Sequence, residues 1–129
     1  MKSHYRVVVI GGGVVGASVI YHLAKFGWSD VCMLERSVLT AGSSWHAAGG
    51  IHALNADPNI SALQAYTIDL LQEIEAESGQ DIGLHMTGGL TMAGTPDRWE
   101  WLQSAYRVYQ SICISDCRLV TPEEARELN

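Results

Sequence analysis

The sequence predicts an α/β fold that begins with a parallel strand, helix and strand. Three observations lead to this prediction. Residues 5–10 form an apolar run rich in β-branched side chains, glycines at GxGxxG spacing follow it, and a second apolar run at 31–34 ends in an acidic residue. Between the two runs, apolar residues recur at helical spacing. This order is typical of a Rossmann-like βαβ unit that binds a dinucleotide.

The first strand is expected over Tyr5 to Ile10, and Gly11, Gly13 and Gly16 lead from it into a helix. In such a motif the first glycine permits a tight turn, the second lets the backbone approach a pyrophosphate, and the third lets helix and strand pack closely. The helix N-terminus adds unpaired N–H groups and the positive end of the helix dipole. We therefore expect an adenine dinucleotide to bind at these glycines.

The helix is expected from Val14 to about Phe26, and Gly27 is placed to end it. The second strand, Val31 to Leu34, runs into Glu35. An acidic residue about 20 positions after the last glycine of the motif commonly hydrogen-bonds the adenosine ribose. The alternative, a solvated charge at a strand end, is less favoured because the complete motif precedes it.

Composition limits the other classes of function. The chain has 129 residues, 47% of them hydrophobic and 17% charged, as expected of one folded domain. A net charge of −6 without a basic cluster argues against nucleic-acid or membrane partners. The cysteines Cys32, Cys113 and Cys117 lack CxxC spacing, so neither a disulfide framework nor a metal site is predicted. No signal peptide is evident, and we expect a cytoplasmic protein.

The segment after Glu35 changes character. Residues 39–50 are rich in Gly, Ala and Ser, so their backbone can run close to a ligand. Only Trp45 and His46 are large aromatic residues within it. From the residues alone, His46 is more simply an incidental loop histidine, although its place beyond the second strand would bring it near the middle of a bound dinucleotide.

Taken together, the motifs resemble those of a known family. The stretches VVVIGGGVVGAS, LER, GSSWHAAG, NADPN, ALQAYT, GLHMTGGL and TPDR are similar to the N-terminus of the dimethylglycine and sarcosine dehydrogenase family. Its members are FAD-dependent amine oxidoreductases with a glutathione-reductase-like FAD-binding domain, often fused to a folate-binding domain. The resemblance extends from Tyr5 to Leu128.

The resemblance implies a role for His46. In this family the corresponding histidine carries the flavin covalently, through a ring nitrogen bonded to the 8α carbon. A neutral imidazole nitrogen is a suitable nucleophile for that bond. The resemblance also places other residues along FAD: Val14 and Val15 at the pyrophosphate, Glu35 and Arg36 at the adenosine, and Ser43, Ser44, Trp45 and Ala47 along the flavin. Ser43 and Ser44 could instead bond their own backbone, as loop serines often do.

The implied reaction is FAD-dependent oxidation of an N-methylated glycine. A hydride would pass from the methyl carbon to the flavin, and the iminium would hydrolyse to formaldehyde or pass to tetrahydrofolate in a further domain. The choice between dimethylglycine and sarcosine stays open, as does that between a carrier protein and oxygen as electron acceptor. A noncovalent FAD oxidoreductase of another small amine or amino acid, or a nucleotide-binding fragment without activity by itself, is the alternative. No catalytic residue is identified, and a eukaryotic parent would place the protein in the mitochondrial matrix.

The second half is expected to contain helices and a short strand. Asp57-Pro58 begins a helix that Gly79 ends, residues 90–93 are expected as a strand, and Thr95-Pro96 begins another helix. Thr121-Pro122-Glu123-Glu124 is a capping box that opens a helix near Asn129. We therefore expect a longer polypeptide, and the resemblance implies that residues 1–129 are the N-terminal part of a discontinuous FAD-binding domain. The remainder of that domain, a substrate domain and a folate domain would lie elsewhere in the parent protein.

Overall fold

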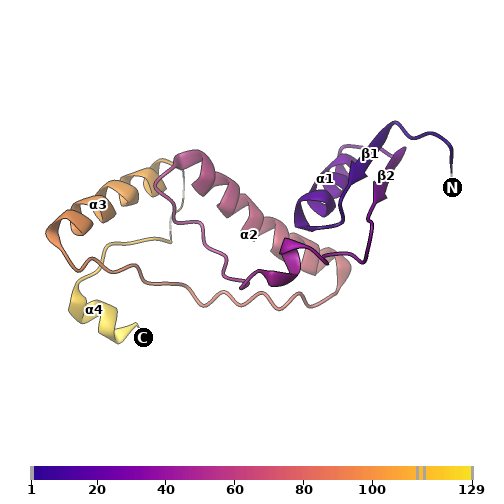
Figure 1. Cartoon of the computed structure of the whole chain (residues 1–129). Helices are drawn as coiled ribbons and strands as arrows, with labels where there is room; N and C mark the ends of the chain where they lie inside the picture. The colour runs from indigo at the N-terminus through magenta and orange to yellow at the C-terminus, as the bar shows by residue number, and fades with distance from the viewer. Residues whose placement is uncertain (1, 113, 115, 129) are drawn as a thin grey trace. The chain divides into compact units, whose positions relative to one another are not determined.

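A computed structural model describes residues 2–112, 114 and 116–128 (Figure 1). The chain divides into two compact units, Met1–Gly50 and Ile51–Asn129, and each is described by itself. The elements are, in order, β1 (Val7–Ile10), α1 (Val14–Lys25), β2 (Val31–Leu34), the short 3₁₀ helix η1 (Ser43–His46), α2 (Pro58–Ser78), α3 (Pro96–Ser111) and α4 (Pro122–Glu127). None of the described helices is both long and apolar enough to span a bilayer.

The first unit is the predicted βαβ arrangement. β1 and β2 pair in parallel, with Val7 opposite Val31 and Ile10 opposite Leu34. α1 packs against both strands, as Figure 1 shows for the indigo part of the chain. β1 begins two residues later than the expected Tyr5, and the other boundaries lie within a residue of those predicted.

α1 ends as Gly27 predicts. Phe26 is the C-cap, and Gly27 follows with a φ of 83°, a conformation that glycine adopts without steric cost. The amide of Gly27 donates to the carbonyl of Ala24 at 2.9 Å, and the amide of Trp28 donates to that of Leu23 at 2.9 Å. These two bonds form a Schellman motif, which satisfies carbonyls at the helix end and redirects the chain toward β2.

Gly16 lies at the closest approach of α1 and the β1–α1 turn. A Cβ on this residue would overlap the carbonyl oxygen of Gly11 and would lie 3.5 Å from a methyl group of Val9. The overlap is with backbone, so a side chain cannot be accommodated by a change of rotamer. Gly16 is therefore the residue that allows the helix to pack this close to the strand.

The second unit is helical. The Asp57 carboxylate caps α2 by accepting from the amides of Asn59 and Ile60 at 2.8 and 3.0 Å. Gly79 ends the helix with a φ of 66°. α2 and α3 pack against each other, and the buried hydrophobic residues of this unit are Leu70, Ala105 and Tyr109. The capping box of α4 is present, with Thr121 and Glu124 bonded reciprocally.

The predicted strand at residues 90–93 is wrong. Residues 79–95 form no helix or strand, and no strand occurs among the described residues of the second unit. A strand is defined by backbone bonds to a neighbouring strand, and this apolar run has none there. Met92 is 82% exposed, which agrees with an extended segment that is not packed. The apolar run alone therefore gave a misleading indication of a strand.

Candidate dinucleotide-binding site

An open groove of about 590 Å³ lies at the carboxyl end of β1 and the N-terminus of α1. Its walls come from the end of β1, the glycine turn, the start of α1 and η1. The lining residues are Val9, Ile10, Gly11, Gly13, Val14, Val15, Gly16, Val19, Ser43, Ser44 and Ala47. Ligands of open α/β sheets bind at this end of parallel strands. The glycine turn and the N-terminus of α1 suit a dinucleotide.

Most of the predicted site residues meet at this groove. The residues that line it as expected are Gly11, Gly13, Val14, Val15, Gly16, Ser43, Ser44 and Ala47. Trp45 and His46 are exposed residues of η1 beside it, while Glu35 and Arg36 follow β2 outside the lining set. The roles of all these residues toward a cofactor stay predictions.

Three lining residues are absent from the sequence prediction. Val9 and Ile10 end β1, and Val19 stands on the second turn of α1. Ile10 is 86% exposed and Val15 is 74% exposed, so the groove presents apolar surface to solvent. The sequence does contain a signal for Ile10, which is its position. A residue just before the first glycine of the motif must stand at the edge of any ligand held there.

Glu35 is bonded to the glycine turn. Its Oε2 accepts from the amide of Gly12 at 2.7 Å, and its Oε1 accepts from the amide of Ser37 at 2.9 Å. These bonds, first that from Gly12, hold the pKa of the carboxyl below its usual value. Each carboxylate oxygen has a further lone pair, so Glu35 can support the turn and still accept from a ribose hydroxyl.

The Glu35 bonds predict a pH dependence of stability. Because its pKa is lowered in the folded protein, Glu35 stabilises the fold at pH values above its ordinary pKa of 4.5. This contribution is lost as pH falls through the lower, folded pKa. We expect Glu35→Gln to flatten the fall of the melting temperature below pH 4.5. Thermal unfolding followed from pH 6 to about pH 3 checks this, and parallel profiles for the two proteins would contradict it.

Thr40 lies beside the glycine turn in a strained backbone conformation. Its φ is 66°, and among the described residues it is the one non-glycine residue with a positive φ. Its amide donates to the carbonyl of Gly12 at 3.0 Å, and its own carbonyl accepts from the amide of Trp45 at 3.1 Å. The left-handed conformation therefore allows one residue to join the glycine turn to η1.

We expect Thr40→Gly to stabilise the protein by up to about 1 kcal/mol, because glycine removes the αL strain while losing part of that gain to chain entropy. Thermal or urea unfolding measures the change. The exposed Val38 has an ordinary negative φ, so Val38→Gly is the matched control and should destabilise. Equal losses in the two variants would show that Thr40 is not strained.

η1 supplies the cap that α1 lacks. Gly13, the N-cap of α1, has no side chain to accept a hydrogen bond. The Ser44 hydroxyl takes that place, because its Oγ accepts from the amide of Val14 at 2.9 Å. A Cβ on Gly13 would lie 3.1 Å from this Oγ, so the glycine also makes room for the serine. A residue from a different element thus satisfies the first helical amide.

The His46 ring is oriented by its own turn. Its Nδ1 lies 3.1 Å from the carbonyl oxygen of Gly42. Since a carbonyl only accepts, this bond requires the proton on Nδ1, and Nε2 of the neutral ring then keeps its lone pair. The Trp45 ring stands edge-on to the imidazole with 6.2 Å between centroids. Nε2 is therefore the ring nitrogen that keeps an available lone pair.

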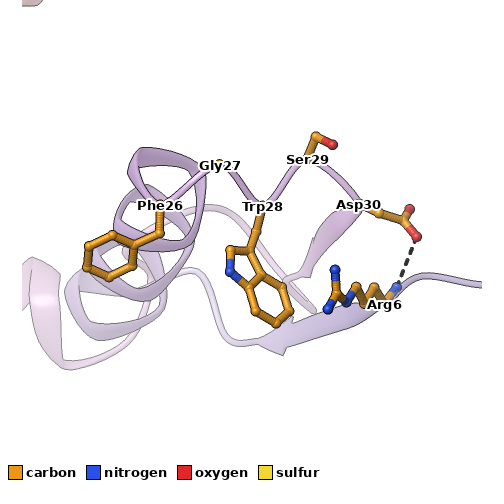
Figure 2. A pocket seen from close by; sticks show the side chains of 6 residues that line it. All are labelled: Arg6, Phe26, Gly27, Trp28, Ser29 and Asp30. Carbon is orange, nitrogen blue, oxygen red and sulfur yellow. Dashed lines mark hydrogen bonds between the residues drawn. The ribbon is translucent and has the colours of Figure 1, made fainter.

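A second, smaller hollow of about 250 Å³ lies at the opposite ends of the strands (Figure 2). Arg6 stacks on Trp28, with its guanidinium carbon 4.2 Å from the ring centroid. The Asp30 carboxylate accepts from the Arg6 amide at 3.2 Å and pairs with Lys2 Nζ at 3.0 Å. The charged groups around this hollow already have partners. We therefore assign these residues a structural role in the connection between α1 and β2.

Metal chemistry is not indicated at either hollow. Over residues 2–112, 114 and 116–128, no three His, Cys, Asp or Glu side chains gather closely enough to hold a metal ion. Cys32 and Cys117 are free thiols, and Cys113 lies outside the described residues.

Sequence comparison matches most of the chain to one protein family. Residues 6–129 match the FAD dependent oxidoreductase family. Mitochondrial dimethylglycine dehydrogenase of Rattus norvegicus is 45% identical over 97 residues, covering 75% of this chain and 11% of that protein. Mitochondrial sarcosine dehydrogenase of Homo sapiens is 35% identical over 129 residues, covering 99% of this chain and 14% of that protein.

A solved structure, L-proline dehydrogenase from P. horikoshii, superposes with a TM-score of 0.86 and 25% identity over 98% of this chain and 33% of that chain. The chain spans 11% and 14% of the length of the two mitochondrial relatives. These findings confirm the resemblance to the dimethylglycine and sarcosine dehydrogenases and the α/β fold. The chain belongs to the family of FAD-dependent oxidoreductases.

Proposed function

We propose that the protein carrying this chain oxidises an N-methylated glycine, dimethylglycine or sarcosine, with an FAD attached covalently to His46. The observation that carries the proposal is the position of His46. It stands on η1, a turn bonded directly to the N-terminus of α1 at the dinucleotide groove. The names of the two mitochondrial relatives support the substrate class.

The residues of this chain would hold and orient FAD. The turn at Gly11 and Gly13 and the positive end of the α1 dipole suit the pyrophosphate, and Val14 and Val15 would lie beside it. Glu35 and Arg36 would bind the adenosine. Ser43, Trp45 and Ala47 would lie along the flavin, and Ser44 would join η1 to α1 beside them. His46 would present Nε2 to the flavin 8α carbon, because Nδ1 is engaged by Gly42.

Bound FAD would supply the redox chemistry by accepting a hydride from the substrate methyl carbon. The part of the chain described here contributes by fixing the cofactor, and covalent attachment prevents its loss. We assign no catalytic acid or base to this chain. Residues that recognise the substrate carboxylate belong to other parts of the protein in this proposal, as do a tetrahydrofolate-binding domain and the contact with an electron carrier or oxygen.

The names of the relatives also support a proposal for the cellular compartment. We propose the mitochondrial matrix for a eukaryotic source, as the names of the relatives indicate for those proteins, and the cytoplasm for a bacterial one. Small molecules and an electron acceptor are the partners we expect, rather than nucleic acid or a membrane.

The proposal is tested on the complete protein that carries this sequence. The purified protein is precipitated with acid, and flavin fluorescence is measured in the pellet and in the supernatant. Peptide mass spectrometry then locates the flavin. We expect it on the peptide that contains His46, and we expect the intact enzyme to release formaldehyde from sarcosine or dimethylglycine.

Flavin recovered only in the supernatant would contradict covalent attachment and favour the alternative, a noncovalent FAD oxidoreductase acting on another small amine or amino acid. Flavin on His46 without turnover of either N-methylated glycine would retain the anchor and reject the substrate. Oxygen consumption with and without an artificial electron acceptor then separates an oxidase from a dehydrogenase.

A further inference from the structure

We propose that Ser44 is a positioning residue, which holds His46 in place for flavin attachment by tethering η1 to the first amide of α1. The inference rests on the proposed attachment of FAD to His46. It assigns Ser44 a task different from direct contact with the cofactor. Ser44 acts through η1, and the hydroxyl is the point at which the two elements join.

The burial pattern singles out Ser44. Of residues 36–50, all described, Ser44 is the one that is not exposed. The others, Trp45 and His46 included, stand in solvent, so they contribute little packing that could hold the segment in place. The direct bond between η1 and α1 is the hydrogen bond from the Val14 amide to Ser44 Oγ at 2.9 Å, and it is the fixed point of η1 on the helix.

Both α1 and η1 favour this hydrogen bond. Gly13 precedes α1 and offers no side chain of its own as a cap. Its missing Cβ leaves room for Ser44 Oγ, which would otherwise meet it at 3.1 Å. An uncapped helix N-terminus and a serine on a neighbouring turn thus satisfy each other across 30 residues of sequence.

His46 is linked to this fixed point through η1. It stands two residues after Ser44 in the same helical turn, and its Nδ1 bonds back to the Gly42 carbonyl. A second connection joins η1 to the glycine turn, because the Thr40 amide donates to the Gly12 carbonyl and the Trp45 amide donates to the Thr40 carbonyl. This connection does not reach α1, so loss of the Ser44 bond should loosen η1 against the helix while the loop stays attached through Thr40.

Attachment of the flavin to His46 is an oxidation, so it needs an electron acceptor. A bond forms between His46 Nε2 and the flavin 8α carbon, one proton leaves that carbon and one leaves the imidazole. The two electrons remain on the flavin until dioxygen accepts them with the two protons as hydrogen peroxide. The reaction needs the nitrogen to reach a single carbon atom, so it is sensitive to small displacements of the ring.

The test uses the complete apoprotein, with FAD added and the acid-stable flavin measured over time. We expect Ser44→Ala to attach flavin about tenfold more slowly than the wild type, the effect expected of one lost hydrogen bond. Ser44→Thr, which keeps the hydroxyl, should restore most of the rate. Ser37→Ala removes a hydroxyl from the same loop outside the groove and should change the rate less than twofold. Amide exchange at Val14 should accelerate in Ser44→Ala.

A second comparison separates positioning from cofactor binding. In a His46→Ala background, FAD binds without attachment, so adding Ser44→Ala should leave the FAD dissociation constant within about twofold. A tenfold weaker affinity in the double variant would overturn the inference and make Ser44 a direct ligand. Attachment at the wild-type rate in Ser44→Ala would overturn it as well. A wild-type protein that attaches no flavin would instead reject the proposed function.

Discussion

Gly16→Ala is expected to abolish retention of FAD and to destabilise the first unit by about 3 kcal/mol or more. The added methyl group would overlap the carbonyl oxygen of Gly11, and relief requires α1 to move away from β1. That movement opens the glycine turn, from which the pyrophosphate would be held. Flavin content after gel filtration and the midpoint of thermal unfolding of the complete protein measure the two effects.

Gly50→Ala is the matched control for this substitution. It introduces the same methyl group into the same unit, where nothing lies within 4 Å of the added atom. We expect its melting temperature to stay within about 2 °C of the wild type. A Gly16→Ala protein that keeps its flavin and its melting temperature would mean that α1 and the turn are not in close contact.

His46→Ala is expected to eliminate acid-stable flavin completely while the protein still binds FAD noncovalently. The variant removes the Nε2 nucleophile, but it leaves the glycine turn, the α1 terminus and Ser44 in place. Mass spectrometry of the denatured protein should show the unmodified polypeptide. The noncovalently held flavin should have a lower reduction potential than the attached flavin. It lacks the histidine substituent at the 8α position, which withdraws electron density.

The control for His46→Ala is His52→Ala, which removes another exposed histidine six positions further along the chain. It should keep the full amount of attached flavin. Acid-stable flavin that persists in His46→Ala would locate the attachment elsewhere. Loss in both variants would indicate a general failure to fold or to load FAD.

The first unit could be predicted because its signals are local. GxGxxG spacing, the apolar stripe of α1 and Gly27 each act within a few residues, and the structure confirms the elements that they predict. The helix starts at Asp57 and Thr121 were predictable for the same reason, since a capping side chain bonds to amides two or three residues away.

The remaining features depend on tertiary contacts. The strand expected at residues 90–93 has the composition of a strand but no neighbour to pair with. The cap that Ser44 gives to α1 joins residues 30 positions apart, and no local sequence pattern predicts it. Thr40 likewise adopts a positive φ because of its bonds to Gly12 and Trp45, although threonine by itself disfavours that region.

The groove has a consequence for the order of folding events. All of its lining residues lie between Val9 and Ala47, and the parallel pair closes over only 24 residues, from Val7 to Val31. Contacts of such short sequence separation form early, because little chain entropy is lost in closing them. We therefore expect the nucleotide cradle to assemble before the more distant parts of a long polypeptide are in place. FAD present during synthesis would then act as a template that selects the correctly formed nascent chain.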